Sequence, residues 1–140
     1  MDRVQETAAV SDSTDPARIR ELMLANLFDV FSERDTARRL KVIESNYTDD
    51  VIWSDPDGTM VGRKALADQA QTLIDRISGL VFSAAGPVHV SRDLGLLAFN
   101  LAAPGQPPAV GGIDVALVRD GRIAVLHTML TTQPPRETQS

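Results

Sequence analysis

The dipeptide Asp120-Gly121 constrains the fold more than any other feature of the sequence, because apolar runs flank it on both sides, Val115–Val118 before it and Ile123–Val125 after it. Aspartate followed by glycine tolerates the positive backbone angles that a two-residue turn between antiparallel strands requires. The segment therefore predicts a tight β-hairpin near the end of the chain.

The predicted hairpin brings an aspartate and a histidine together. If the loop has two residues, Arg119 pairs with Arg122, and counting back along both strands places Asp114 opposite His127. Facing side chains approach closely, and this face is otherwise apolar, so neither residue can be buried unpaired without cost. Two interpretations stay open: an acid–base dyad in which Asp114 raises the basicity of His127, or a mutually satisfied pair that only maintains the register. A register shifted by one residue would separate the two side chains.

Helical periodicity dominates the first half of the chain, and alternating or continuous apolar runs dominate the second half. Caps and breakers such as Asp15-Pro16, Asp35 and Gly79 delimit the helical segments. The expected helices cover residues 16–31, 36–47 and 63–77. The expected strands cover residues 51–53, 59–61, 80–90, 94–102, 109–119 and 122–132. Helices followed by hairpin-connected strands are typical of an α+β domain with an antiparallel sheet.

Length, charge and composition restrict the class of protein. The 140 residues carry a formal net charge of −5 and are 43% apolar, which fits one globular domain with one core. An acidic surface repels phosphate backbones, so no nucleic-acid partner is expected. Cysteine is absent and no apolar stretch suits a signal peptide or a membrane span, so we expect a cytoplasmic protein without membrane contact. The expected organisation is a flexible segment at 1–14, one domain at 15–133 and a flexible tail at 134–140.

Four short motifs follow one another in a characteristic order. They are Tyr47-Thr48-Asp49-Asp50-Val51-Ile52-Trp53, Asp55-Pro56-Asp57-Gly58-Thr59-Met60-Val61-Gly62-Arg63, Gly112-Ile113-Asp114 and Asp120-Gly121-Arg122-Ile123. Together they resemble the SnoaL-like branch of the nuclear transport factor 2-like superfamily. The resemblance implies a cone-shaped α+β fold, in which a curved antiparallel sheet wraps around three helices and encloses an apolar pocket. It also implies a homodimer formed through the outer face of the sheet.

The resemblance implies two kinds of acid–base chemistry. In comparison with ketosteroid isomerases, which share the fold, Asp55 occupies the general-base position and Asp114 the oxyanion-site position. The first helix departs from that pattern, since it offers Leu27 and Phe31 where a tyrosine is expected. Polyketide cyclases of the SnoaL type use a pocket aspartate with a nearby histidine, which Asp114 and His127 would match. Epoxide hydrolases of this fold use an Asp-Arg-Asp group, for which the predicted pocket strands offer no arginine.

We therefore expect a cofactor-independent acid–base enzyme, of isomerase, cyclase or dehydratase type, that acts on a small apolar carbonyl compound in a buried pocket. The expected catalytic residues are Asp55, Asp114 and His127. The expected substrate-binding residues are Leu27, Phe31, Trp53, Met60, Asn100 and Met129. No metal site is expected, because neither histidine has carboxylates at a ligand spacing. The alternative is a non-catalytic module of the same fold that binds an apolar ligand or dimerises.

Overall fold

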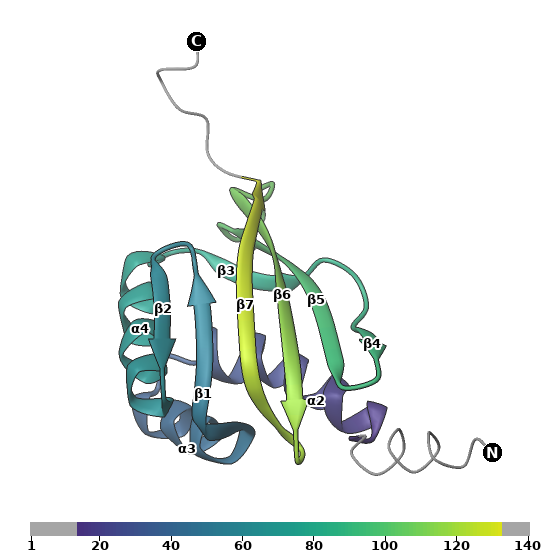
Figure 1. The fold of residues 1–140 in the computed structure, drawn as a ribbon. Helices are drawn as coiled ribbons and strands as arrows, with labels where there is room; N and C mark the ends of the chain where they lie inside the picture. The colour runs from purple at the N-terminus through teal and green to yellow at the C-terminus, as the bar shows by residue number, and fades with distance from the viewer. Residues whose placement is uncertain (1–13, 133–140) are drawn as a thin grey trace, which may run out of the picture.

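The structure, a computed structural model, describes residues 14–132, and four helical segments precede or interrupt the strands (Figure 1). The predicted flexible segments, 1–14 and 134–140, lie outside the described residues except for Thr14. The helical segments are α2 (Pro16–Ala25), η1 (Asn26–Phe31), α3 (Thr36–Asn46) and α4 (Arg63–Arg76). The strands are β1 (Tyr47–Asp55), β2 (Gly58–Val61), β3 (Val81–Ala84), β4 (His89–Ser91), β5 (Leu94–Ala102), β6 (Val110–Arg119) and β7 (Arg122–Thr132).

All strands belong to one curved sheet with the order β2-β1-β7-β6-β5-β3, and β4 pairs separately with β5. The helices lie on one side of this sheet: α2 packs on β5 and β6, and α4 packs on β1 and β2 (Figure 1). The α+β class with three helical regions around a curved sheet is confirmed. The sheet is mixed rather than purely antiparallel, because β1 pairs in parallel with β7. Local sequence patterns do not encode that pairing, since the two strands come from opposite halves of the chain.

The first helix changes its winding halfway along. Asp15 caps it as expected, accepting a hydrogen bond from the Ala17 amide at 2.9 Å, and Pro16 occupies the first turn. The chain is α-helical to Ala25 and π-helical from Asn26 to Phe31, where the sequence pattern predicts one uninterrupted α-helix. The wider π turn buries a polar residue, Asn26, together with three apolar neighbours on the side that faces the sheet. Such π segments are frequent at functional sites.

Tyr47 starts a strand, whereas we predict it at the end of the second helix. The helix α3 ends at Asn46, and the Tyr47 amide only closes its last turn before the chain extends into β1. In this position the Tyr47 side chain is fully buried beneath the sheet rather than on a helix surface. Asp35 caps α3 as expected, accepting a hydrogen bond from the Arg38 amide at 3.0 Å.

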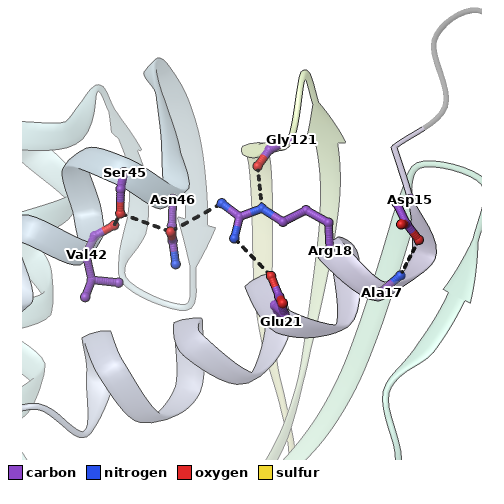
Figure 2. Close-up of polar contacts among 8 residues, drawn as sticks. All are labelled: Asp15, Ala17, Arg18, Glu21, Val42, Ser45, Asn46 and Gly121. Carbon is purple, nitrogen blue, oxygen red and sulfur yellow. Dashed lines mark hydrogen bonds and ion pairs between the residues drawn. The ribbon is translucent and has the colours of Figure 1, made fainter.

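The side chain of Arg18 joins the first helix to two segments that are distant in sequence (Figure 2). Its Nε donates to the Gly121 carbonyl oxygen at 3.0 Å, in the turn between β6 and β7. A second nitrogen reaches the Asn46 side-chain oxygen at the end of α3, at 3.5 Å, and a third contacts Glu21 at 3.3 Å. The contact with Gly121 holds the closed end of the hairpin against the first helix, and the contact with Asn46 links that helix to the end of α3.

The predicted hairpin is present, but its register changes after the first two pairs of the ladder. Asp120 and Gly121 have φ angles of 54° and 78°, as a tight two-residue turn requires, and Arg119 pairs with Arg122 as expected. Ala124 is then an extra residue on β7, because Val118 pairs with Ile123 whereas Leu117 pairs with Val125. This β-bulge shifts the ladder by one position as far as the pair Gly112–Leu130, and a second irregularity follows before Gly111 pairs with Thr132.

The bulge makes the predicted pairing of Asp114 with His127 wrong. Asp114 pairs with Thr128, and His127 pairs with Val115. Because successive side chains alternate between the two faces of a strand, the shift moves His127 to the outer face and brings Thr128 to the inner one. His127 is exposed, whereas Asp114 is buried.

The long strand predicted at 80–90 is two short strands, β3 and β4. Both pair antiparallel with β5, at Val81–Ala84 and at His89–Ser91. Gly86 adopts a φ of 142° and Pro87 lacks a backbone donor, so the ladder is interrupted between them. The short β3 strand forms one edge of the sheet, which matters for the cavity described below.

The sheet is apolar on both faces, but the helices within residues 14–132 cover only one. The inner face carries the main core, which includes Trp53, Leu97 and Leu126. On the outer face, large apolar side chains remain exposed: Ile52 and Val61 at 41% and 66% of their surface, and others on β6 and β7. Within residues 14–132, no helix is long and apolar enough to cross a membrane.

Candidate functional site

A carboxyl group lies inside the apolar core, on the inner face of β6. Asp114 exposes only 3% of its surface and accepts two hydrogen bonds, one on each oxygen. Asn26 Nδ2 donates to Oδ2 at 3.0 Å from the π-helical segment, and Thr128 Oγ1 donates to Oδ1 at 2.7 Å from β7. The π turn and the β-bulge are therefore the two irregularities that bring these donors to Asp114.

Two further side chains fix the direction of these hydrogen bonds. Trp53 Nε1, which can only donate, lies 3.1 Å from Thr128 Oγ1, so the Thr128 hydroxyl proton is free to point at Asp114. On the other side, Tyr47 Oη donates to Asn26 Oδ1, which orients the Asn26 amide with its nitrogen toward Asp114. The result is a network of two arms that both donate into one carboxyl group.

Burial controls the protonation of this network. Removal from water raises the pKa of Asp114 to about 7, although the hydrogen bonds from Thr128 and Asn26 act in the opposite direction. The pKa of Tyr47 is raised well above its ordinary value of 10.0, mainly by burial and further by the charge of Asp114. At neutral pH the Tyr47 hydroxyl is thus protonated, and Asp114 can hold or release a proton with little cost. Such tuning is typical of groups that transfer protons.

Two cavities extend from this carboxyl group toward the surface. The inner cavity, of about 40 Å³, is lined by Asp114 and Thr128 together with apolar side chains, among which the Phe31 and Trp53 rings have centroids 4.9 Å apart. The outer cavity has a volume of about 280 Å³ and opens between α4 and the ends of the strands. The two cavities share four lining residues, namely Leu73, Phe82, Phe99 and Thr128, so they are two compartments of one apolar site.

The mouth of the outer cavity is polar. Asp55, Asp57 and Arg76 all line it. Arg76 and Gln69 each donate to Asp57 at 3.0 Å, and the hydrogen bond from Arg76, followed by that from Gln69, holds the pKa of Asp57 below its ordinary value. Asp55 accepts from the amides of Asp57 and Gly58 and, on its other oxygen, from Gln69 at 3.1 Å. Asp55 thus caps its own turn and faces the cavity at once.

A glycine shapes the wall between the two cavities. A Cβ atom at Gly112 would lie 2.3 Å from Phe99 Cζ and 2.8 Å from the Met129 carbonyl oxygen. Only glycine therefore leaves room for the Phe99 ring, which lines both cavities, next to β6 at this position. Gly112, which belongs to one of the four sequence motifs, therefore has a packing role.

The predicted site residues divide between the two faces of the sheet. Asp55 lines the outer cavity and also the groove on the outer face, Asp114 lines the inner cavity, and so do Leu27, Phe31 and Trp53. The remaining predicted residues lie elsewhere: Met60 packs against the core, Asn100 is on the outer face of β5, and Met129 and His127 line an open groove on the outer face.

Three residues of the network were not among the predicted site residues. Asn26 continues the apolar stripe of the first helix, three residues after Met23, and a polar residue at such a position is the signal that could have revealed it. The pairing of Thr128 with Asp114 can be predicted only if the bulge at Ala124 is known. Tyr47 was predicted on a helix, away from the sheet. Within the described part of the chain, no group of three or more acidic or histidine side chains is arranged to hold a metal ion.

Comparisons with solved structures identify the same fold in other proteins. A candidate isomerase of the SnoaL-like family from Agrobacterium tumefaciens str. C58 superposes with a TM-score of 0.76 at 20% identity, covering 83% of this chain and 99% of that one. A candidate SnoaL-like polyketide cyclase from Jannaschia sp. CCS1 has a TM-score of 0.69 at 14% identity, covering 84% of this chain and 90% of that one. A candidate ketosteroid isomerase from Kribbella flavida DSM 17836 has a TM-score of 0.64 at 17% identity, covering 90% and 88%. At these identities the likeness establishes the fold alone.

A family model extends the comparison to the sequence. No curated protein matches the chain. The model of the SnoaL-like domain matches residues 24–126, which include Asn26, Tyr47, Asp55 and Asp114 and most of the sheet. That range covers well over half of the chain and agrees with the four motifs of the sequence. The chain belongs to the SnoaL-like family.

Proposed function

We propose that this protein is a cofactor-independent acid–base enzyme, of isomerase, cyclase or dehydratase type, acting on a small apolar carbonyl compound. Asp114 donates a hydrogen bond to the carbonyl oxygen, and Asp55 removes a proton from the neighbouring carbon. The observation that carries the proposal is the placement of two carboxyl groups along connected apolar cavities: Asp114 lies at the inner end, where burial raises its pKa to about 7, and Asp55 lies at the open end. Groups with such different environments divide the roles of acid and base between them.

The network around Asp114 supports its role as the hydrogen-bond donor. Asn26 and Thr128 each present a donor to one Asp114 oxygen, so neither can accept the proton of the neutral acid. That proton is therefore available to an acceptor in the inner cavity. A carbonyl oxygen placed there gains stabilisation as negative charge develops on it during proton removal. The surrounding aromatic and aliphatic side chains strengthen this effect by excluding water.

The environment of Asp55 suits a base. Its carboxylate accepts three hydrogen bonds, from two backbone amides and from Gln69. An ionised carboxylate offers about four acceptor positions, so one remains for the proton of a substrate. In an isomerisation Asp55 takes the proton from the carbon next to the carbonyl, the negative charge moves to the oxygen beside Asp114, and Asp55 returns the proton to another carbon.

Deuterium exchange tests the proposal without knowledge of the natural substrate. Cyclohexanone is incubated in D₂O with the protein, and loss of the α-proton signal is followed by NMR. We expect Asp55→Asn to slow the protein-dependent exchange by about 10²- to 10⁴-fold, the usual contribution of a general base. Asp49→Asn, the same change at an exposed aspartate of β1 that lines neither cavity, is the matched control and leaves the rate unchanged. Equal rates for Asp55→Asn and the unmodified protein would refute the assignment of Asp55.

The alternative, a non-catalytic binding module, has its own supporting observation. The side-chain donors and acceptors that meet at Asp114 all have protein partners, and the inner cavity of about 40 Å³ has little more than the volume of one water molecule. In that case cyclohexanone binds without any protein-dependent exchange, and neither Asp55→Asn nor Asp114→Asn changes the exchange rate.

We also propose that two copies of the chain associate through the outer face of the sheet. The support is the row of exposed apolar side chains on adjacent strands, among them Ile52, Val61, Leu117 and Met129, on a face that no described helix covers. A second copy offers the same apolar face, and closed two-fold pairing is the commonest way to bury one. Leu117→Lys should convert a dimer into a monomer in analytical ultracentrifugation, while a monomer before substitution would refute the proposal.

A further inference from the structure

One phenylalanine borders every compartment of the apolar site. Phe82 lines the inner cavity beside Asp114, the outer cavity that opens at Asp55, and a third cavity of about 110 Å³ under Ile74 and Leu80. Every other lining residue borders at most two of these three spaces. The Phe82 side chain therefore forms part of the wall that separates the three cavities from one another.

The position of Phe82 in the fold allows its side chain to be replaced without disturbing the central strands. Phe82 lies on β3, a strand of four residues at the edge of the sheet that pairs only with β5, opposite Leu101. Its ring meets the Phe99 ring at an interplanar angle of 70°, with centroids 5.5 Å apart. Phe82 is only partly buried, whereas Phe99 is buried and held over Gly112. Of the two rings, Phe82 is the one whose removal leaves the central strands in place.

The volumes on either side of the ring define a size limit. The outer cavity of about 280 Å³ lies just below the range of ~300–1,000 Å³ that is usual for sites of drug-sized ligands. The third cavity is apolar apart from Ser32 and Arg34, and it lies directly behind the Phe82 ring. A ligand that fills the outer cavity thus meets the ring before it can reach this extra space.

We propose that Phe82 is a specificity-determining residue, which restricts the site to ketones of one or two rings and excludes larger fused ring systems. The inference rests on the proposed function, since it names the size class of the carbonyl compound that the same site accepts. It does not require that Phe82 take part in the chemistry. Its role is to separate the cavity under Ile74 and Leu80 from the cavities that contain the two carboxyl groups.

Binding of three saturated ketones measures the size limit directly. Cyclohexanone, 2-decalone and 5α-androstan-3-one carry the same functional group on one, two and four rings. Trp53, the single tryptophan of the chain, lines the inner cavity, so its fluorescence reports occupancy. The proteins compared are the unmodified chain, Phe82→Ala, Phe82→Leu and Val81→Ala. The last is the control, because Val81 is on the same strand, is exposed, and borders neither of the two cavities beside the carboxyl groups.

We expect Phe82→Ala to raise the affinity for 5α-androstan-3-one relative to cyclohexanone by about tenfold or more, since burial of two further CH₂ groups is worth a factor of this order. Phe82→Leu should give a smaller change in the same direction, and it decides the question if Phe82→Ala does not fold. Val81→Ala should leave the ratio of affinities unchanged.

The inference is overturned if the ratio for both Phe82 variants equals that of the unmodified chain, including the case in which no protein binds any of the ketones. That result is distinguishable from failure of the proposed function. If ketones bind with the predicted size limit while Asp55→Asn leaves deuterium exchange unchanged, the size limit stands and the catalytic roles fall. If exchange depends on Asp55 but ring size has no effect in any variant, the catalytic roles stand and the role of Phe82 falls.

Discussion

The two faces of β7 hold neighbouring residues in opposite environments. Thr128 points into the core, where it accepts a hydrogen bond from Trp53 and donates to Asp114. His127, one position earlier, lies exposed in an open groove on the outer face. The inner face combines a cavity and directed hydrogen bonds with burial, and burial raises the pKa of Asp114 to about 7 although the hydrogen bonds lower it. In this fold, the capacity of a side chain for acid–base chemistry therefore depends on the face of the sheet more than on the type of residue.

The largest effect should come from truncating a core side chain on the inner face of β7. Leu126→Ala removes a fully buried side chain, whereas Met129, on the outer face of the same strand, exposes 47% of its surface. We expect Leu126→Ala to lower the free energy of unfolding by about 3–5 kcal/mol, the scale for loss of a buried leucine. Urea unfolding measures it.

Met129→Ala is the control for that substitution, because it shortens an exposed side chain of the same strand. It should cost no more than about 1 kcal/mol at low protein concentration. A Leu126→Ala variant that unfolds at the same urea concentration as Met129→Ala would show that the two faces of β7 contribute equally to stability.

The next largest effect is a change in the free energy of unfolding with pH, which we expect from the buried Asp114 on the inner face. The pKa of Asp114 is about 7 in the folded protein and near its ordinary value of 3.8 in the unfolded chain. Folding therefore takes up a proton between these values, and the free energy of unfolding should fall by a few kcal/mol as the pH rises from about 4 to about 7. Above that window it should be constant with respect to this group.

Asp114→Asn sharpens this test, because the substitution removes the titrating group and retains its shape. The fall in stability between pH 4 and 7 should be much smaller in the variant, as measured by urea unfolding at several pH values. Deuterium exchange of cyclohexanone by the unmodified protein, corrected for buffer, should decrease as the pH rises through about 7, because Asp114 must keep its proton to donate. An exchange rate that increases through the same range would assign Asp114 as the base instead.

The smallest expected effect is the difference in stability between variants of the adjacent residues Thr128 and His127. Thr128→Val leaves Trp53 Nε1 without an acceptor and Asp114 Oδ1 without a donor, and a buried group left unpaired costs about 1–3 kcal/mol. His127→Gln, in the open groove, should change the free energy of unfolding by less than about 0.5 kcal/mol. Thermal unfolding at low protein concentration measures both. Equal losses for the two variants would remove the distinction between the faces.

Much of the fold could be predicted because its signals are local. Asp15-Pro16 begins the first helix, Asp35 caps the second, and Asp120-Gly121 forms the tight turn, each through contacts within a few residues. The parallel pairing of β1 with β7 could not be predicted in the same way. It depends on how two distant segments pack on the same helices, which no short pattern encodes.

The candidate site was predicted only in part, for a related reason. Asp55 and Asp114 were named from the sequence and line connected cavities. The predicted partner of Asp114 was wrong, because counting back from the turn assumes a regular ladder and one inserted residue changes every later pair. Asn26 and Tyr47 escaped notice because one lies in a π-helical turn and the other at a strand start, both within segments whose periodicity predicts ordinary helix.

By itself, the sequence determined the fold class, the hairpin turn, the helix caps and the presence of a carboxyl group on an apolar strand. Only the tertiary structure decided which side chains surround that carboxyl group. The physical reason is that turns and caps depend on dihedral preferences and hydrogen bonds between near neighbours, whereas the Asp114 network depends on packing. The bulge at Ala124 and the π turn at Asn26 are retained because they bury Leu126 and pair Asp114, and those gains exist only in the assembled core.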